Sequence, residues 1–140
     1  MTENGSLLAL DVGEKRIGVA LASAAAKLAS PYSTLQHTET ILQDILSIIE
    51  KESVQVIVVG LPRGMEGQET QQTKDTRAFA EHLKAAVQVP VYMQDETLTS
   101  VKAEEELSNR GKTFLKEDID ALAATYILED FINTSEGLAI

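Results

Sequence analysis

The sequence contains no cysteine and no tryptophan, and only 4% of its 140 residues are aromatic. The absence of cysteine excludes a disulfide framework, a thiolate metal site and a cysteine nucleophile. No apolar run approaches the roughly 20 residues that a membrane-spanning helix requires, and the N-terminal residues lack the basic segment of a signal peptide. Hydrophobic residues still make up 44% of the chain. We therefore expect one intracellular domain over residues 1–140 with an aliphatic core, and frayed tails at 1–5 and 133–140.

Positive charge is also scarce, since 12 Lys and Arg stand against 22 Asp and Glu and give a formal net charge of −10. Such a chain repels phosphate backbones at long range, which disfavours non-specific binding to nucleic acid. The bases are clustered, at Lys15 and Arg16, within residues 63–77 and within residues 110–116. A nucleic-acid partner therefore requires a local basic surface, or metal ions that invert the sign of an acidic site.

The apolar pattern predicts the element order β-β-β-α-β-α-β-α-α. We expect strands at residues 7–11, 17–21, 29–35, 54–60 and 89–93, and helices at 39–51, 69–87, from within 97–100 to 109, and 118–132. Pro31 places the third strand at an edge of the sheet, and the β-branched run 54–60 is typical of a strand covered on both faces. The predicted fold class is α/β, with a mixed five-stranded sheet flanked by helices.

Three acids occupy positions where the pattern favours an apolar residue or a ligand. Asp11 interrupts the first strand before Gly13, and Glu96 follows Asp95 at the exit of the fifth strand. Asp120 lies on a helical row that faces the core with Ala123, Ala124, Ile127 and Phe131. A carboxylate on such a row must be paired, hydrogen-bonded, metal-bound or near an edge. Taken singly, each acid is equally well explained as a turn or helix cap or as a solvated strand end.

Together, three convergent carboxylates require a shared cation, because their mutual repulsion would otherwise raise their pKa values. Oxygen ligands without histidine or cysteine select Mg²⁺ or Mn²⁺ over Zn²⁺. Two such ions about 4 Å apart can hold the attacking and leaving oxygens of a phosphodiester, so no nucleophilic side chain is needed. His37 and His82 lie beside no acidic motif, and we expect both at the surface.

Four motifs together resemble the YqgF family, whose members are described as Holliday junction resolvases or pre-16S rRNA processing nucleases. The motifs are Leu10–Ala20, Val59–Pro62 with Met65–Gly67, Asp95–Thr99 and Ile119–Ala124. The resemblance covers residues 8–131 and implies an RNase H-like fold. Each motif alone is weak, but four in the same order make the resemblance specific.

Carried over by position, the resemblance assigns the family's catalytic and metal-binding acids to Asp11, Glu96 and Asp120. It implies a cytoplasmic nuclease that uses Mg²⁺ or Mn²⁺ to process the 5′ end of pre-16S rRNA. The alternatives are a Holliday junction resolvase and a non-catalytic module that binds RNA or ribosomal precursor particles. We expect pre-rRNA or branched DNA as the partner, no membrane, and a monomer or weak dimer.

The sequence departs from the family at Thr97, where the family usually has an arginine after the Asp-Glu pair. A hydroxyl cannot hold a phosphate bidentately as a guanidinium does, so Thr97 is a weaker phosphate ligand. The other candidate phosphate contacts are Lys15, Arg16 and Arg63, although each is equally consistent with a solvated surface. The loop 61–67 has a glycine where the family often has asparagine, which suggests either a substrate-gating loop or a flexible connection.

One rival interpretation is a phosphotransferase of the actin and hexokinase type, whose first hairpin also contains Asp-x-Gly before an apolar strand. Those proteins bind nucleotide between two such lobes, and 140 residues supply one. Tight ATP binding by this chain would favour that rival.

Overall fold

The computed structural model describes residues 4–96, 105–106, 108–109 and 116–134. Its elements are β1 (Ser6–Val12), β2 (Arg16–Ser23), β3 (Ala29–Gln36), α1 (Ile41–Lys51), β4 (Val54–Pro62), α2 (Gln71–Ala86), β5 (Val91–Glu96) and α4 (Lys116–Thr134). The α/β class, the predicted order up to the fifth strand and the final helix are confirmed. The predicted helix up to residue 109 lies mostly outside the described residues, and α4 extends into the predicted C-terminal tail.

The five strands form one mixed sheet in the order β3-β2-β1-β4-β5. The first three are antiparallel neighbours, whereas β4 pairs parallel with β1 and β5 pairs parallel with β4. Strand β3, which contains Pro31, lies at an edge as predicted. Because β1, β4 and β5 run in the same direction, their carboxyl ends meet at one edge of the sheet.

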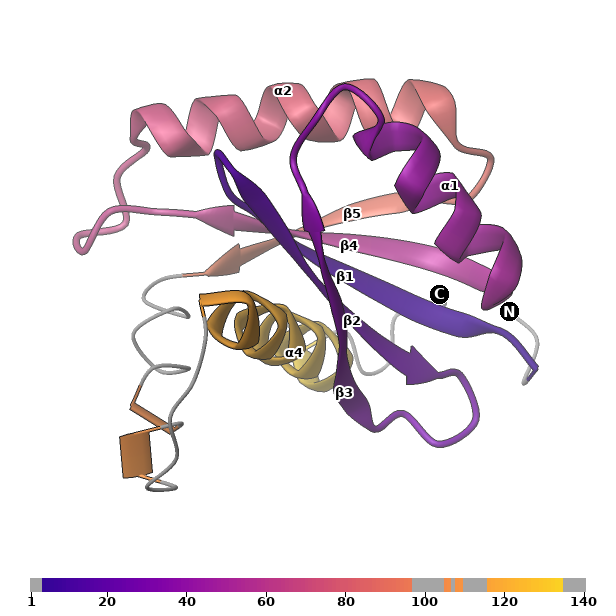
Figure 1. Ribbon diagram of the computed structural model, residues 1–140. Coiled ribbons are helices and arrows are strands. Elements are labelled where there is room, and N and C mark those ends of the chain that lie inside the picture. The colour runs from indigo at the N-terminus through magenta and orange to yellow at the C-terminus, as the bar shows by residue number, and fades with distance from the viewer. Residues whose placement is uncertain (1–3, 97–104, 107, 110–115, 135–140) are drawn as a thin grey trace.

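Helices α1 and α2 lie on one side of the sheet and α4 on the other (Figure 1). The α1/α2 side encloses large aliphatic side chains that are fully buried, among them Leu8, Leu10, Ile45, Ile57 and Leu83. The α4 side buries a second apolar cluster that includes Leu7, Ile127 and Leu128, and burial of apolar surface on both sides stabilises the fold. In the part of the chain that the structure describes, no helix is long and apolar enough to cross a membrane.

The α4 side of the sheet carries glycines where the helix comes closest. A Cβ atom added to Gly18 on β2 would lie 1.9 Å from the carbonyl oxygen of Asp120. A Cβ atom added to Gly60 on β4 would lie 2.3 Å from Cδ1 of Ile127. The absence of a side chain at these two positions allows α4 to pack directly on the backbone of the sheet.

Candidate active site

Asp11 and Asp120 come together at the edge where β1 ends. Asp11 follows Leu7 and Ala9 at the two-residue spacing of one strand face, and those residues pack in the core that α4 covers. In the antiparallel register Asp11 is opposite Gly18, and the backbone of Asp120 lies over that glycine. The α4 helix thus carries its carboxylate beside Asp11.

The electrostatics of Asp11 are consistent with that placement. Burial of the carboxyl group, and secondarily repulsion by Asp120, raise the pKa of Asp11 from 3.8 to about 7. Without a bound cation, the ionised form of Asp11 is therefore unfavourable at this position. Perturbed carboxylates of this kind occur at functional sites more often than elsewhere.

Arg16, at the start of β2, forms an ion pair with Asp120. Its Nε donates a hydrogen bond to Oδ2 of Asp120 over 2.7 Å, with side chains that are 26% and 19% exposed. The hydrogen bond, reinforced by the carboxylate charge, raises the pKa of Arg16. The first turn of α4 is also tied to β3, because Thr34 Oγ1 donates to the carbonyl oxygen of Glu117 over 2.7 Å. The sequence predicted Arg16 as a phosphate contact and did not predict this pairing.

Glu96 is the last residue of β5 and lies at the same edge of the sheet. Tyr92, four residues earlier on the same strand face, contacts Phe131 of α4 with ring centroids 5.6 Å apart. Glu96 therefore projects from the face that α4 covers, and one of its carboxylate oxygens, Oε1, is buried. Strand β4 separates β5 from β1.

The structure does not gather all three predicted acids into one cluster. Within the described ranges, no group of three or more Asp, Glu, His or Cys side chains is close enough to hold a metal ion. Asp11 and Asp120 interact, while Glu96 shares their face and edge of the sheet but lies two strands away from Asp11.

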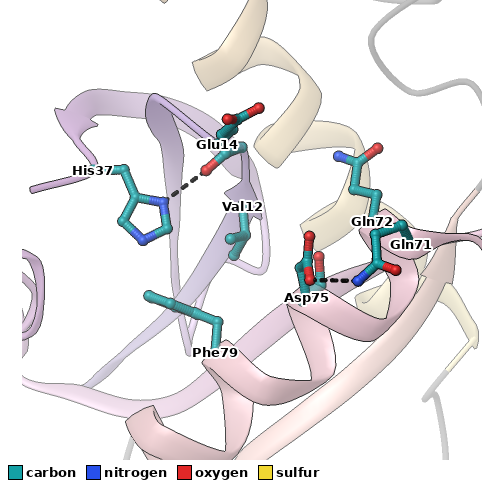
Figure 2. A pocket seen from close by; sticks show the side chains of 9 residues that line it. Val12, Glu14, His37, Gln71, Gln72, Asp75 and Phe79 are labelled. Carbon is teal, nitrogen blue, oxygen red and sulfur yellow. Dashed lines mark hydrogen bonds between the residues drawn. The ribbon is translucent and has the colours of Figure 1, made fainter.

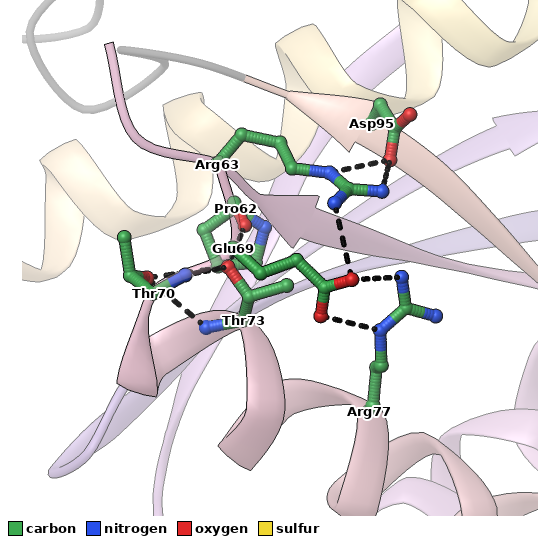
Figure 3. A network of polar contacts seen from close by, with 7 residues as sticks. All are labelled: Pro62, Arg63, Glu69, Thr70, Thr73, Arg77 and Asp95. Carbon is green, nitrogen blue, oxygen red and sulfur yellow. Dashed lines mark hydrogen bonds and ion pairs between the residues drawn. The ribbon is translucent and has the colours of Figure 1, made fainter. Parts of the chain in front are cut away.

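Arg63 belongs to a network of charged side chains with Glu69, Arg77 and Asp95 (Figure 3). Its guanidinium donates to Oδ1 of Asp95 over 3.2 Å and lies 3.6 Å from Glu69, which also binds Arg77. The backbone N–H of Arg63 donates to the carbonyl oxygen of Glu96 over 3.1 Å. Arg63, predicted as a phosphate contact, is thus engaged with two carboxylates in this structure. It lines a hollow of about 470 Å³ together with Gly67, Asp95 and Glu96.

The glycine-containing loop between β4 and α2 is internally hydrogen-bonded. The N–H of Gly64 donates to the carbonyl oxygen of Gln68 over 2.8 Å, and the N–H of Gly67 donates to the carbonyl oxygen of Gly64 over 2.9 Å. Gly67 has a φ of 84°, in the left-handed region that favours glycine. The loop ends in a capping box in which Thr70 and Thr73 bond reciprocally at the start of α2. These contacts fix the loop beside Glu96.

The other two predicted phosphate contacts are Lys15 and Thr97. Lys15 is exposed in the turn between β1 and β2, and Thr97 lies outside the described residues. Sequence reasoning also overlooked Gly18, although a lone glycine inside an apolar strand run signals the close approach of another backbone.

Comparisons with known proteins agree with these observations. Residues 5–134 match the model of the RuvX family, which is described as Holliday junction resolvase. A protein of Chloroflexus aurantiacus named "Putative pre-16S rRNA nuclease" is 41% identical over 131 residues, which cover 91% of this chain and 86% of that protein. A protein of the same name from Rickettsia typhi is 41% identical over 134 residues, with 93% and 86% covered.

Among solved structures, T. thermophilus RuvC in complex with Holliday junction substrate is similar, with a TM-score of 0.56 and 14% identity. The match covers 93% of this chain and 95% of that chain, and it supports the RNase H-like fold. The family match and the two relatives agree with the motifs that resemble YqgF proteins, and the chain belongs to the RuvX (YqgF) family.

Proposed function

We propose that the chain is a metal-dependent nuclease that hydrolyses phosphodiester bonds in structured nucleic acid, with pre-16S rRNA as its substrate. The observation that carries the proposal is the meeting of Asp11 and Asp120 at the edge of the sheet, where α4 packs on Gly18. The names of the relatives favour an rRNA precursor as the substrate. We place this activity in the cytoplasm, on ribosomal precursor particles.

The residues at the site fit a divalent cation. Asp11 and Asp120 offer hard oxygen ligands, which Mg²⁺ and Mn²⁺ prefer. Burial and, secondarily, repulsion by Asp120 raise the pKa of Asp11, and a bound cation would offset both effects. Asp11 and Asp120 would hold the ion, with Glu96 as the third ligand from the same face of the sheet. When bound, such ions activate a water molecule and neutralise charge on the scissile phosphate.

The chain's own residues orient and admit the substrate. Arg16 fixes one oxygen of Asp120 through Nε, and its terminal nitrogens are suited to a phosphate oxygen. Lys15, exposed on the same turn, adds a positive charge at the point where a backbone would cross the sheet edge. The net charge of −10 makes this local basic surface the favoured approach for a polyanion.

The description of the family favours a second candidate function, the resolution of Holliday junctions. Cutting a two-fold symmetric junction at paired positions calls for a symmetric dimer. A nuclease acting on one RNA strand needs a single copy, so the oligomeric state and the preferred substrate separate the two functions.

A cleavage assay tests the proposal. Labelled pre-16S rRNA 5′ fragments and four-way DNA junctions are incubated with Mn²⁺ and either the native chain, Asp11→Asn or the control Asp44→Asn on α1, away from the site. Asp11→Asn should lower the cleavage rate at least about 100-fold, without lowering the melting temperature, because an ionised Asp11 is disfavoured in the fold. Asp44→Asn should cleave at the native rate.

Cleavage that survives Asp11→Asn would move the chemistry to other residues. If the native chain binds the RNA but does not cleave it with either Mg²⁺ or Mn²⁺, the protein is instead a non-catalytic module of the same fold.

A further inference from the structure

A second hollow, of about 610 Å³, opens at the same edge of the sheet but on the α1/α2 side (Figure 2). It lies between the end of β1, the residue after β3 and the first turns of α2. Val12 lines it, and Val12 packs in the α1/α2 core while the adjacent Asp11 faces α4. The hollow and the acidic pair therefore lie on opposite faces of the sheet at the end of β1.

His37 is held firmly in the wall of this hollow. Its Nδ1 lies 2.7 Å from the carbonyl oxygen of Gly13, and its backbone N–H donates to the carbonyl oxygen of Lys15 over 2.9 Å. Because a carbonyl only accepts, Nδ1 carries the hydrogen and Nε2 of the neutral ring is an acceptor. The ring meets Phe79 edge to face, with centroids 5.4 Å apart. His37 is half-buried at the wall of this hollow, and His82 is exposed as predicted.

The polar groups that line the hollow are rich in acceptors. Asp75 accepts a hydrogen bond from Nε2 of Gln71 over 2.9 Å. Glu14, Gln72 and Thr76 are the other polar side chains of the lining besides His37. No lysine or arginine is among the described residues that line the hollow. A phosphate would be repelled here, whereas a planar group with several N–H donors would find carboxylates, an imidazole and an aromatic ring.

We propose that this hollow binds an unpaired guanine base of the substrate strand. Guanine offers N1–H and N2–H donors on one edge, a pattern that matches a carboxylate such as that of Asp75. Its ring would lie against Phe79 and His37, as unpaired RNA bases do on aromatic side chains. The volume of the hollow is within the range of small-molecule sites, and the phosphates would remain outside, near the exposed Lys15.

The inference deepens the proposed nuclease function and rests on it for the identity of the ligand. The bound guanine would anchor the RNA strand on one side of β1, while the phosphodiester lies at Asp11 and Asp120 on the other side. A base held in this way would set which bond reaches Asp11 and Asp120, so that a guanine near the cut would be preferred.

Fluorescence anisotropy with short labelled RNAs tests the inference on the full chain carrying Asp11→Asn, which prevents cleavage during the measurement. The probes are oligouridine with one central guanosine and the same RNA with inosine, which lacks the N2 amino group. Guanosine should bind about 5–10-fold more tightly than inosine, the contribution of one hydrogen bond. Asp75→Asn, an exposed position, should abolish the difference, and Asp44→Asn should retain it.

Phe79→Leu, which keeps an apolar side chain in the core, should weaken binding of the guanosine probe while the melting temperature is monitored. Equal binding of guanosine and inosine RNAs, or discrimination that survives Asp75→Asn, would overturn the inference. GMP that binds as tightly as the guanosine RNA would make this a free-nucleotide site and contradict the strand assignment.

The native chain is assayed for cleavage in parallel. Guanine-selective binding by a chain that never cleaves would support this inference and refute the nuclease function. Cleavage without any preference for guanine would refute this inference alone.

Discussion

The two faces of the sheet differ most at the edge where β1 and β4 end. Successive residues on three strands point to opposite sides there: Leu10, Ile17 and Val59 pack toward α1 and α2, whereas Asp11, Gly18 and Gly60 face α4. On one face, branched aliphatic side chains lie between the sheet and its helices. On the other face, α4 packs directly on the backbone of two glycines. Both faces bury apolar side chains that stabilise the fold, and the close approach of α4 also brings Asp120 beside Asp11.

The largest effect is expected from a methyl group at Gly18, which would disturb the packing of α4 on the sheet. In Gly18→Ala the new Cβ would meet the carbonyl oxygen of Asp120 at 1.9 Å, and backbone atoms cannot rotate away as side chains can. We expect a loss of roughly 2–3 kcal/mol in the free energy of unfolding. The cleavage rate should fall about 100-fold, because Asp120 would be displaced. Urea unfolding and the cleavage assay measure the two effects.

Gly60→Ala is the matched control on the same face. Its Cβ would meet Cδ1 of Ile127 at 2.3 Å, the end of a side chain that can adopt another rotamer at a cost of about 1 kcal/mol. Stability should fall by about that amount and cleavage should change little. If the two alanine variants lost activity equally, the approach of α4 at Gly18 would have no special role in placing Asp120.

Removal of the Arg16 guanidinium should have an intermediate effect, on catalysis more than on folding. In Arg16→Ala, Asp120 loses the hydrogen bond that orients it, so kcat should fall about 10–100-fold with a smaller change in KM. Arg16→Lys should restore part of the rate, since it returns the charge without the fork of donors. Steady-state kinetics at fixed Mn²⁺ provide the measurement.

Lys15→Ala, in the same turn, serves as the control because Lys15 is exposed. It should raise KM and leave kcat nearly unchanged. An Arg16→Ala variant that changes only KM would show that Arg16 contacts substrate and does not position Asp120.

The smallest effect is expected at Arg63. Its partners Asp95 and Glu69 have side chains that are 68% and 45% exposed, and pairs of this kind contribute between 0 and about 1 kcal/mol. Arg63→Ala should therefore shift the urea midpoint only slightly, and high salt should reproduce the shift in the native chain. A loss above about 2 kcal/mol would mean that this network stabilises the fold as strongly as the core does.

The sequence was sufficient for features that follow from local periodicity. The β-branched run of β4 predicted a strand covered on both faces, and the helical row of Asp120 with Ala123 and Ile127 predicted that this acid faces the sheet. These patterns repeat within a few residues, and burial enforces them. The edge position of β3 also followed from a single residue, Pro31.

Contacts between distant segments could not be predicted in the same way. Arg16 and Asp120 are 104 positions apart. No local sequence pattern distinguishes an arginine that pairs with a carboxylate of the protein from one that binds a substrate phosphate. The two contacts of His37 with the β1–β2 turn depend on where β3 ends, which periodicity locates only to within several residues. The predicted role of Thr97 remains a prediction.

A crystal soaked in Mn²⁺ and measured at the manganese absorption edge tests the central claim most directly. We predict an anomalous peak bound by the carboxylates of Asp11 and Asp120, with Glu96 drawn in as the third ligand. Manganese found only elsewhere on the chain, with Asp11 and Asp120 still apart from any cation, would contradict the account.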